Sequence, residues 1–110
     1  NLVVSFFATW CVPCAKEIPE LIKMSKEFGD DFQFILVDVN EKRDLVKKHV
    51  AEKRIPLQVI LDKYGKVFES FSGVTLPLLV VIDKKGQITY HHTGYVKGDE
   101  KNLLKHLKTL

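Results

Sequence analysis

Residues 2–21 read LVVSFFATWCVPCAKEIPEL, and they contain the only two cysteines of the 110-residue chain, Cys11 and Cys14. The β-branched and aromatic residues Leu2–Phe7 predict a buried strand, whereas apolar residues recur at close to helical spacing over Ala15–Phe28. The cysteines therefore lie where a strand gives way to the N-terminus of a helix. Unpaired backbone N–H groups and the helix dipole stabilise a thiolate there, and only the thiolate attacks a disulfide. The segment predicts a redox-active dithiol.

The spacing of the two cysteines indicates different roles for them. Cys11 opens the first helical turn and can face solvent, whereas Cys14 is partly covered by the turn above it. We therefore expect Cys11 to be the attacking thiol and Cys14 the resolving thiol. Pro13 suits this turn, because its ring presets the helical φ angle and its missing N–H would have no helical partner. A disulfide that closes so short a loop restricts the unfolded chain very little, so we expect the pair to serve chemistry.

The composition predicts a single domain over residues 1–110. With 45% hydrophobic and 28% charged residues, the chain can bury a core and is too apolar for a disordered tail. Its net charge of +3 is scattered, with no basic run interleaved with aromatics, so we expect no nucleic-acid binding. The longest apolar stretch, Leu76–Ile82, is too short to span a membrane. Because the chain starts without Met, at or within a strand, we expect a trimmed or processed N-terminus that has lost any signal peptide or anchor.

The rest of the chain alternates between strand and helix patterns. Strands are expected at residues 32–39, 57–61, 78–82 and 87–92, and helices at residues 41–53 and 99–110. Residues 66–71 fit a strand or a helix on periodicity alone, and both interpretations stay open. Pro56 is expected to be an ordinary proline at the entry to a strand. His91 and His92 alternate along a strand, so they point to opposite faces and cannot chelate one metal ion together.

The order of these elements resembles the thioredoxin fold: a strand, Trp-Cys-x-x-Cys, a helix, a strand, a helix, then a proline before a hairpin and a closing helix. A bare Cys-x-x-Cys is a weak signal, because zinc sites use it too. The longer string Cys-x-x-Cys-x-x-Glu-x-Pro, which includes Glu17 and Pro19, resembles the extracytoplasmic thiol-disulfide oxidoreductases of the TlpA/ResA type. The separation of Cys11 and Pro77 also exceeds that of ordinary thioredoxins by roughly a helix and a strand. The resemblance implies a three-layer α/β/α fold with a central mixed sheet and the αβ insertion of that group.

The resemblance implies a set of site residues as well. Pro77 would be a cis-proline that faces the dithiol and turns the neighbouring backbone toward an extended substrate. The substrate-binding surface would consist of Trp10, Val12, Pro13, Leu76 and Pro77. We expect Trp10 to belong to the core and to the wall of the active site. Leu78 follows Pro77 where many relatives carry Thr, which gives the groove a more apolar character if Leu78 faces it.

One departure from ordinary thioredoxins concerns proton transfer. Those proteins carry a buried Asp six residues before the first cysteine, whereas this chain has Ser5 there. In the TlpA/ResA pattern the matching acid is Glu17, one turn beyond Cys14. We therefore expect Glu17 to take the proton of Cys14, and we expect burial and nearby negative charge to raise its pKa.

The sequence thus predicts a thiol-disulfide oxidoreductase that uses no cofactor and no metal ion. Val12 and Pro13 offer no His or charged group that would selectively stabilise the Cys11 thiolate, which favours the reducing direction. By resemblance, the substrates would be protein disulfides outside the cytoplasm, as in cytochrome c maturation. The electrons would come from a membrane-bound thiol donor, and the protein would be a monomer.

Two alternatives remain open. The first is a cytoplasmic general thioredoxin, which a signal peptide or anchor upstream of this chain would exclude. The second is a metal-binding chaperone that uses Cys11, Cys14 and a distant His. Copper chaperones of this fold generally space their cysteines one residue wider, and neither His91 nor His92 lies in a recognisable ligand motif. We therefore favour the redox interpretation.

Overall fold

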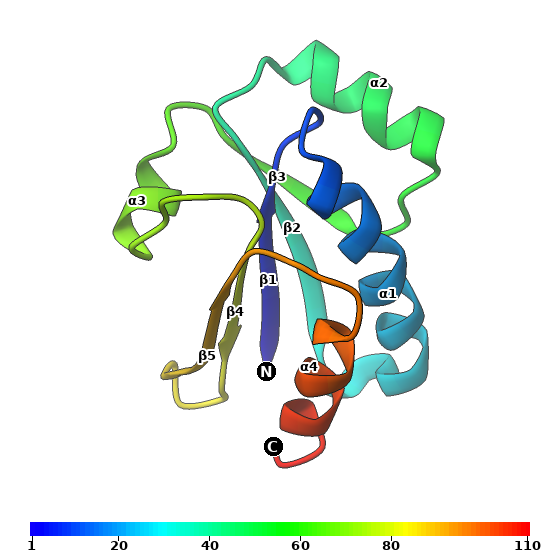
Figure 1. Ribbon diagram of the computed structural model, residues 1–110, viewed down its shortest axis with the longest axis vertical. Helices are drawn as coiled ribbons and strands as arrows, with labels where there is room; N and C mark the ends of the chain where they lie inside the picture. The colour runs from blue at the N-terminus through cyan, green and yellow to red at the C-terminus, as the bar shows by residue number, and fades with distance from the viewer.

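Five strands form one mixed sheet in the order β3-β2-β1-β4-β5 in the computed structural model, which describes residues 1–110 (Figure 1). The central strand β1 (Leu2–Phe7) pairs in parallel with β2 (Gln33–Val39), and β2 pairs in parallel with the edge strand β3 (Gln58–Asp62). On its other side, β1 pairs antiparallel with β4 (Leu78–Ile82), which pairs antiparallel with β5 (Ile88–Thr93). The expected mixed sheet and its terminal hairpin are confirmed.

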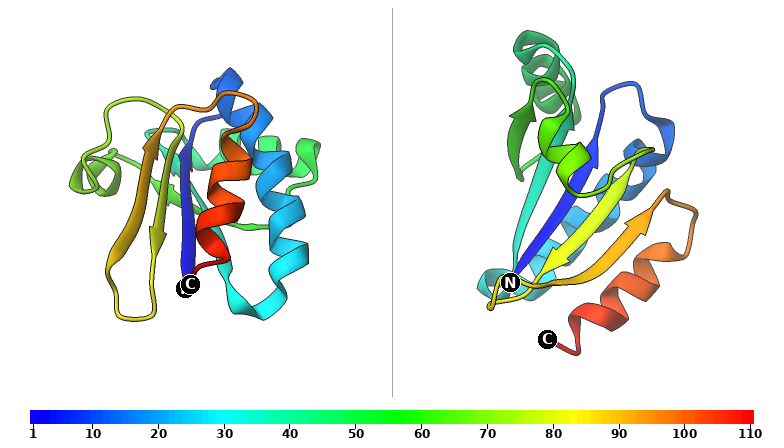
Figure 2. Two further views of the ribbon diagram at one scale, coloured as in Figure 1. Left: turned by 60° about the horizontal axis from the view of Figure 1, so that its bottom comes forward. Right: turned by 90° about the vertical axis from the view of Figure 1, so that its left-hand side faces the viewer.

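Helices cover both faces of this sheet. The long helix α1 (Val12–Phe28) and the closing helix α4 (Asp99–Leu107) lie side by side on one face, and the short helix α3 (Lys66–Ser70) lies on the other (Figure 2). A 3-10 turn at Gly29–Asp31 joins α1 to β2. The arrangement confirms the three-layer α/β/α architecture. No helix is both long and apolar enough to cross a membrane.

Helix α2 (Arg43–Lys53) and β3 form a unit between β2 and α3, at the place where the sequence predicts an αβ insertion. The helix carries the chain from β2 to the parallel strand β3, a connection that requires a crossover of this length. It begins two residues later than expected, because Asn40 has a left-handed φ of 58° and Glu41 turns back toward the end of β1. Pro56 precedes β3 as an ordinary trans proline.

The core has two parts, one on each face of the sheet. Side chains of β1 alternate between them, so Val3 and Phe7 face α1 and α4, whereas Val4 and Phe6 face α3. The ring of Phe6 lies 5.6 Å from the ring of Phe68 on α3. The same alternation places the polar residue Ser5 on the α1 face, deep in the larger cluster.

Of residues 66–71, for which the sequence left strand and helix open, Lys66–Ser70 form the helix α3 and Phe71 is its C-cap. The carboxylate of the buried Asp62 accepts hydrogen bonds from the N–H groups of Val67 and Phe68, at 3.2 and 2.8 Å. It thereby satisfies N–H groups that have no helical partner in a first turn. This contact joins residues on two sides of a turn, and no periodicity within the segment reveals it.

Candidate active site

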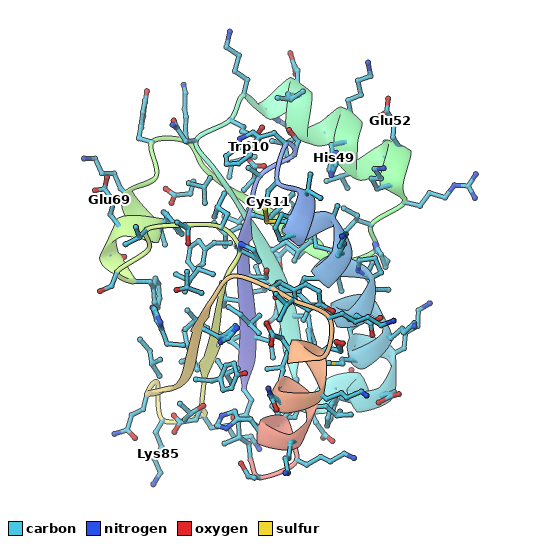
Figure 3. All side chains as sticks on the ribbon, viewed as in Figure 1. Trp10, Cys11, His49, Glu52, Glu69 and Lys85 are labelled. Carbon is cyan, nitrogen blue, oxygen red and sulfur yellow. A yellow bond between two sulfur atoms is a disulfide. The ribbon has the colours of Figure 1, made fainter.

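Cys11 and Cys14 lie where β1 gives way to α1, and a disulfide joins them (Figure 3). Cys11 is the N-cap residue of α1, and its Sγ accepts a hydrogen bond from the N–H of Cys14 at 3.3 Å. Its own N–H donates to the carbonyl of Ala8 at 3.1 Å, which fixes the turn from strand to helix. Sulfur thus takes the place of the usual N-cap oxygen. In the reduced protein, the same N–H and the helix dipole stabilise a Cys11 thiolate.

Both cysteines are buried in this disulfide-bonded state. Cys11 is 4% exposed and Cys14 is 1% exposed, so the expectation that Cys11 faces solvent is wrong here. The reason is packing, since both cysteines belong to the larger core cluster together with Ala8 and Ile18. Helix α1 begins at Val12, directly after its cap Cys11, so the predicted position of the dithiol at the start of the helix is confirmed.

Glu17 lies one turn beyond Cys14 on the buried side of α1 and is only 3% exposed. Its Oε1 accepts a hydrogen bond from the Ser5 hydroxyl at 2.9 Å. Burial raises the pKa of Glu17 to about 7, while the bond from Ser5 and the nearby charge of His92 pull it partly back. The raised pKa has the direction that the sequence led us to expect. The structure also brings together the acid and the serine that stands in place of the strand Asp.

A polar cluster from β5, α4 and the loop between them lies next to Glu17. The imidazole Nε2 of His92 lies 3.1 Å from Oδ2 of Asp99, and Tyr95 donates its hydroxyl to Glu100 at 2.9 Å. These four side chains and Glu17 line one small cavity. His91 faces the other way, exposed, with its Nε2 at 2.8 Å from the carbonyl of Phe71. The predicted opposite orientation of the two histidines is confirmed.

Trp10 is 71% exposed, so its expected place in the core is wrong. It lies beyond the end of β1, in the turn before α1, and belongs to neither core cluster (Figure 3). There it lines a groove of about 430 Å³ on the dithiol side of the molecule. The other lining residues come from the end of β2, from α3 and from the segment before β4: Val39, Asn40, Phe68, Val74, Thr75 and Leu76. Val12 is exposed and Pro13 is half-buried at the start of α1.

Pro77 lies immediately before β4, and the peptide bond between Leu76 and Pro77 is cis. The carbonyl of Pro77 accepts a hydrogen bond from Gly94 at 2.8 Å, whereas the backbone N–H and carbonyl of Leu76 make no backbone hydrogen bond. Leu78 is fully buried in the cluster on the α3 face. The suggestion that Leu78 lines the groove is therefore wrong, because strand alternation turns its side chain into the core.

Two carboxyl groups near the dithiol were not identified from the sequence. Asp38 is 1% exposed and pairs in register with Phe7, four residues before Cys11. Glu41 accepts hydrogen bonds from both the N–H and the hydroxyl of Thr9, at 2.7 and 2.6 Å. The one available signal was an Asp within the apolar run ILVDV of a buried strand.

The family model for Redoxin matches residues 1–107. The chain belongs to the Redoxin family. It is 32% identical over 79 residues to the thiol-disulfide oxidoreductase ResA of Bacillus thuringiensis, which covers 69% of this chain and 44% of that protein. It is also 32% identical over 72 residues to the chloroplastic thioredoxin Y of Oryza sativa, which covers 66% of this chain and 42% of that protein. The chain thus spans less than half the length of these two relatives.

Solved structures confirm that this Redoxin-family chain has a thioredoxin-like fold. The exposed lipoprotein thioredoxin Etrx1 of Streptococcus pneumoniae is 26% identical, with a TM-score of 0.86 over 99% of this chain and 84% of that one. A putative thiol:disulfide interchange protein DsbE of Chlorobium tepidum superposes with a TM-score of 0.89 over 98% of this chain and 77% of that one. The latter is 23% identical, and its similarity concerns the fold alone. The resemblance to the TlpA/ResA type is therefore confirmed by both sequence and fold.

Proposed function

We propose that this Redoxin-family chain is a thiol-disulfide oxidoreductase that exchanges electrons between its dithiol and protein disulfides. The observation that carries the proposal is the position of Cys11 Sγ as the cap of α1, where it accepts the N–H of Cys14. A sulfur in that position is stabilised as a thiolate, which is the reactive species in exchange.

In the reducing direction, the Cys11 thiolate attacks one sulfur of a substrate disulfide and displaces the other as a thiolate. Cys14 then loses its proton and attacks Cys11 Sγ, which releases the second substrate thiolate and closes the Cys11–Cys14 disulfide. Two electrons pass to the substrate, and its two thiolates take up protons. The oxidising direction is the reverse of these steps.

Glu17 is the proposed acceptor for the proton of Cys14. It lies one turn away on the same helix, and its pKa of about 7 lets it gain and lose a proton near neutral pH. The hydroxyl of Ser5 orients the carboxylate of Glu17 but is not itself an acid. A serine on the strand and a glutamate on the helix would thus replace the single strand Asp of ordinary thioredoxins.

The proposed substrate is an extended protein segment with an apolar side chain next to its disulfide. The free N–H and carbonyl of Leu76 can pair with the backbone of such a segment. The groove beside them offers Trp10, Val74 and Phe68 as apolar contacts. We infer from these features that Trp10, Val12, Pro13, Leu76 and Pro77 form the substrate-binding surface.

We further propose that the protein works as a monomer outside the cytoplasm, in cytochrome c maturation, with a membrane-bound thiol protein as donor. The support is the Cys-x-x-Cys-x-x-Glu-x-Pro motif and the similarity to ResA. A general thioredoxin is the second candidate, and the similarity to rice thioredoxin Y favours it. The two candidates differ in their partners.

Trapping tests the roles of the two cysteines and the nature of the partners. Cys14→Ser should accumulate mixed disulfides through Cys11, because no resolving thiol remains, whereas the matched Cys11→Ser variant should trap far fewer. In cells, partners confined to extracytoplasmic proteins such as apocytochromes support the first candidate, and many cytoplasmic partners support a general thioredoxin. Equal trapping by both variants contradicts the assigned roles.

The pH dependence of exchange tests the role of Glu17. We would measure the reaction of reduced protein with a model disulfide from mildly acidic to alkaline pH. Glu17→Gln should slow exchange near neutral pH and change the shape of the profile. The matched control is Glu20→Gln, which removes a carboxylate of α1 that pairs with Lys23 at 3.7 Å on the surface. Superimposable profiles for wild type and Glu17→Gln would remove Glu17 from the mechanism.

A further inference from the structure

Asp38 is the one buried side chain whose polar atoms accept no hydrogen bond. Both of its carboxyl oxygens are sealed from solvent, and neither accepts a hydrogen bond from an N–H or O–H group. An ionised carboxylate in such a site would lose its hydration without compensation, which strongly disfavours the charged form. The site therefore favours the neutral, protonated acid.

A protonated Asp38 needs an acceptor, and the candidate is the carboxylate of Glu41, three residues further along the chain. A hydrogen bond to Glu41 contributes, after burial, to raising the pKa of Asp38 to about 8. Burial alone would raise the pKa of Glu41 too, but hydrogen bonds from Asp38 and Thr9 lower it below its ordinary value. The two carboxyl groups thus move in opposite directions, as expected for one acid and one carboxylate that share a proton.

The carboxylate of this pair also holds the segment that leads to the dithiol. Glu41 Oε1 accepts the N–H of Thr9 at 2.7 Å and Oε2 accepts its hydroxyl at 2.6 Å. Thr9 directly precedes Trp10 and Cys11, and Asp38 lies across from Phe7 in the β1–β2 register. The first part of the β1–α1 connection is therefore tied to the end of β2 and to Glu41, two residues beyond it.

We infer that Asp38 and Glu41 share one proton and act as positioning residues that hold Thr9, and with it Trp10 and Cys11, in place. Loss of the shared proton places two negative charges side by side in a buried site. Their repulsion moves Glu41 away from Asp38 and loosens its two bonds to Thr9. Only the consequence for disulfide exchange depends on the proposed function; the hold on Thr9 and Trp10 does not.

The other charged groups near the pair come from three neighbouring elements. From α2, His49 lowers the pKa of Glu41 by its charge, and its ring packs 6.4 Å from that of Phe7. From β3, Asp62 is next to the residue paired with Asp38, and its carboxylate is engaged by α3. From α1, Cys11 and Cys14 do not titrate while the disulfide is intact. Controls must separate two other groups from the pair: His49, which lies near Glu41, and Glu17, whose pKa of about 7 falls in the same pH range.

Fluorescence of Trp10, the single tryptophan of the chain, tests the inference in the oxidised protein, where no thiol titrates. From about pH 6 to about pH 9, below most tyrosine ionisation, wild type should show a one-proton change in emission centred near the Asp38 pKa of about 8. Asp38→Asn should keep the low-pH emission and lose the change, because its amide donates to Glu41 at every pH. Glu17→Gln and His49→Gln should retain the change.

Three results would overturn the inference: a flat wild-type titration, a change that persists in Asp38→Asn, or its loss in Glu17→Gln or His49→Gln. If Asp38→Asn fails to fold, Glu41→Gln decides the matter. This variant removes the charge beside Asp38 and the carboxylate that shares its proton, so the midpoint of the emission change should move to lower pH. An unchanged midpoint contradicts a proton shared between Asp38 and Glu41.

A functional readout follows in the reduced protein. The exchange rate of wild type should depart at alkaline pH from that of Asp38→Asn and match it below neutrality. If wild type shows the fluorescence change but exchanges no disulfides, the result counts against the proposed function and leaves the shared proton of Asp38 and Glu41 standing.

Discussion

Replacing Glu17 by Gln should make the protein more stable at alkaline pH, although it impairs the proposed proton transfer. The pKa of Glu17 rises from 4.5 to about 7 on folding, with burial as the largest cause. The folded protein therefore binds this proton more tightly than the unfolded chain. As the pH rises from the pKa of the unfolded chain toward the pKa of the folded protein, the folded state loses stability. Above both pKa values the loss is constant. That loss amounts to about 3 kcal/mol.

Gln has nearly the same shape and never ionises, so this loss is absent in the variant. The effect is measured by urea unfolding of both oxidised proteins at about pH 5 and about pH 8. The difference in unfolding free energy between variant and wild type at one pH is subtracted from that at the other. All other titrating groups are common to both proteins and cancel in this double difference. The stability advantage of Glu17→Gln over wild type should be larger at the higher pH by about 2.5 kcal/mol. The urea m-values should be unchanged, since both proteins expose the same surface on unfolding.

The reasoning fails if the double difference is close to zero, because the Glu17 carboxyl would then titrate alike in the folded and unfolded states. It also fails if the variant is destabilised more at the higher pH than at the lower one. That sign would mean that the ionised carboxylate, not the protonated acid, is the form that folding prefers. Glu20→Gln, at the surface of the same helix, should give no comparable pH-dependent difference.

Three further outcomes are expected. Ser5→Ala removes the hydrogen bond that lowers the pKa of Glu17, so this pKa should rise above about 7, as measured by NMR titration of the carboxyl carbon. Gly73→Ala places a methyl group within the ring of Phe68 and should cost about 1–3 kcal/mol in urea unfolding, and no loss would show that the ring moves aside freely. Asp62→Ala removes the acceptor for the first turn of α3 and should cost about 1–2 kcal/mol, with faster amide exchange confined to that helix.

The fold could be predicted because its determinants are local and repeat along the chain. The apolar run of β1, the helical spacing after Cys14 and the turn residues at 83–86 each specify an element without reference to the rest. The order of these elements then leaves few topologies, since parallel neighbours require a crossover. Only residues 66–71 stayed ambiguous, because α3 is too short for periodicity and depends on a bond from Asp62.

The site was predicted less completely, because its features depend on contacts between distant residues. The motif identified Cys11, Cys14 and Glu17, but no pattern states how deeply a cysteine packs once the disulfide is closed. Trp10 illustrates the opposite error. A tryptophan side chain is on average well buried, but Trp10 lies just beyond the end of a strand and is exposed there. Glu41 was missed because its hydrogen bonds with Thr9 join the segment after β2 to the turn after β1, and Asp38 because only the strand register places it beside Phe7.

Buried carboxyl groups stand at two places near the dithiol, and they differ in what they can do. Glu17 lies on α1 itself, one turn from Cys14, and its pKa of about 7 lets it change protonation during exchange near neutral pH. Asp38 lies on the sheet, and with a pKa of about 8 it stays protonated over most of that range. A group that must exchange a proton in each turnover needs a pKa near the working pH, whereas a group that holds a segment in place needs one outside it. On these values, Glu17 suits proton transfer and Asp38 suits positioning.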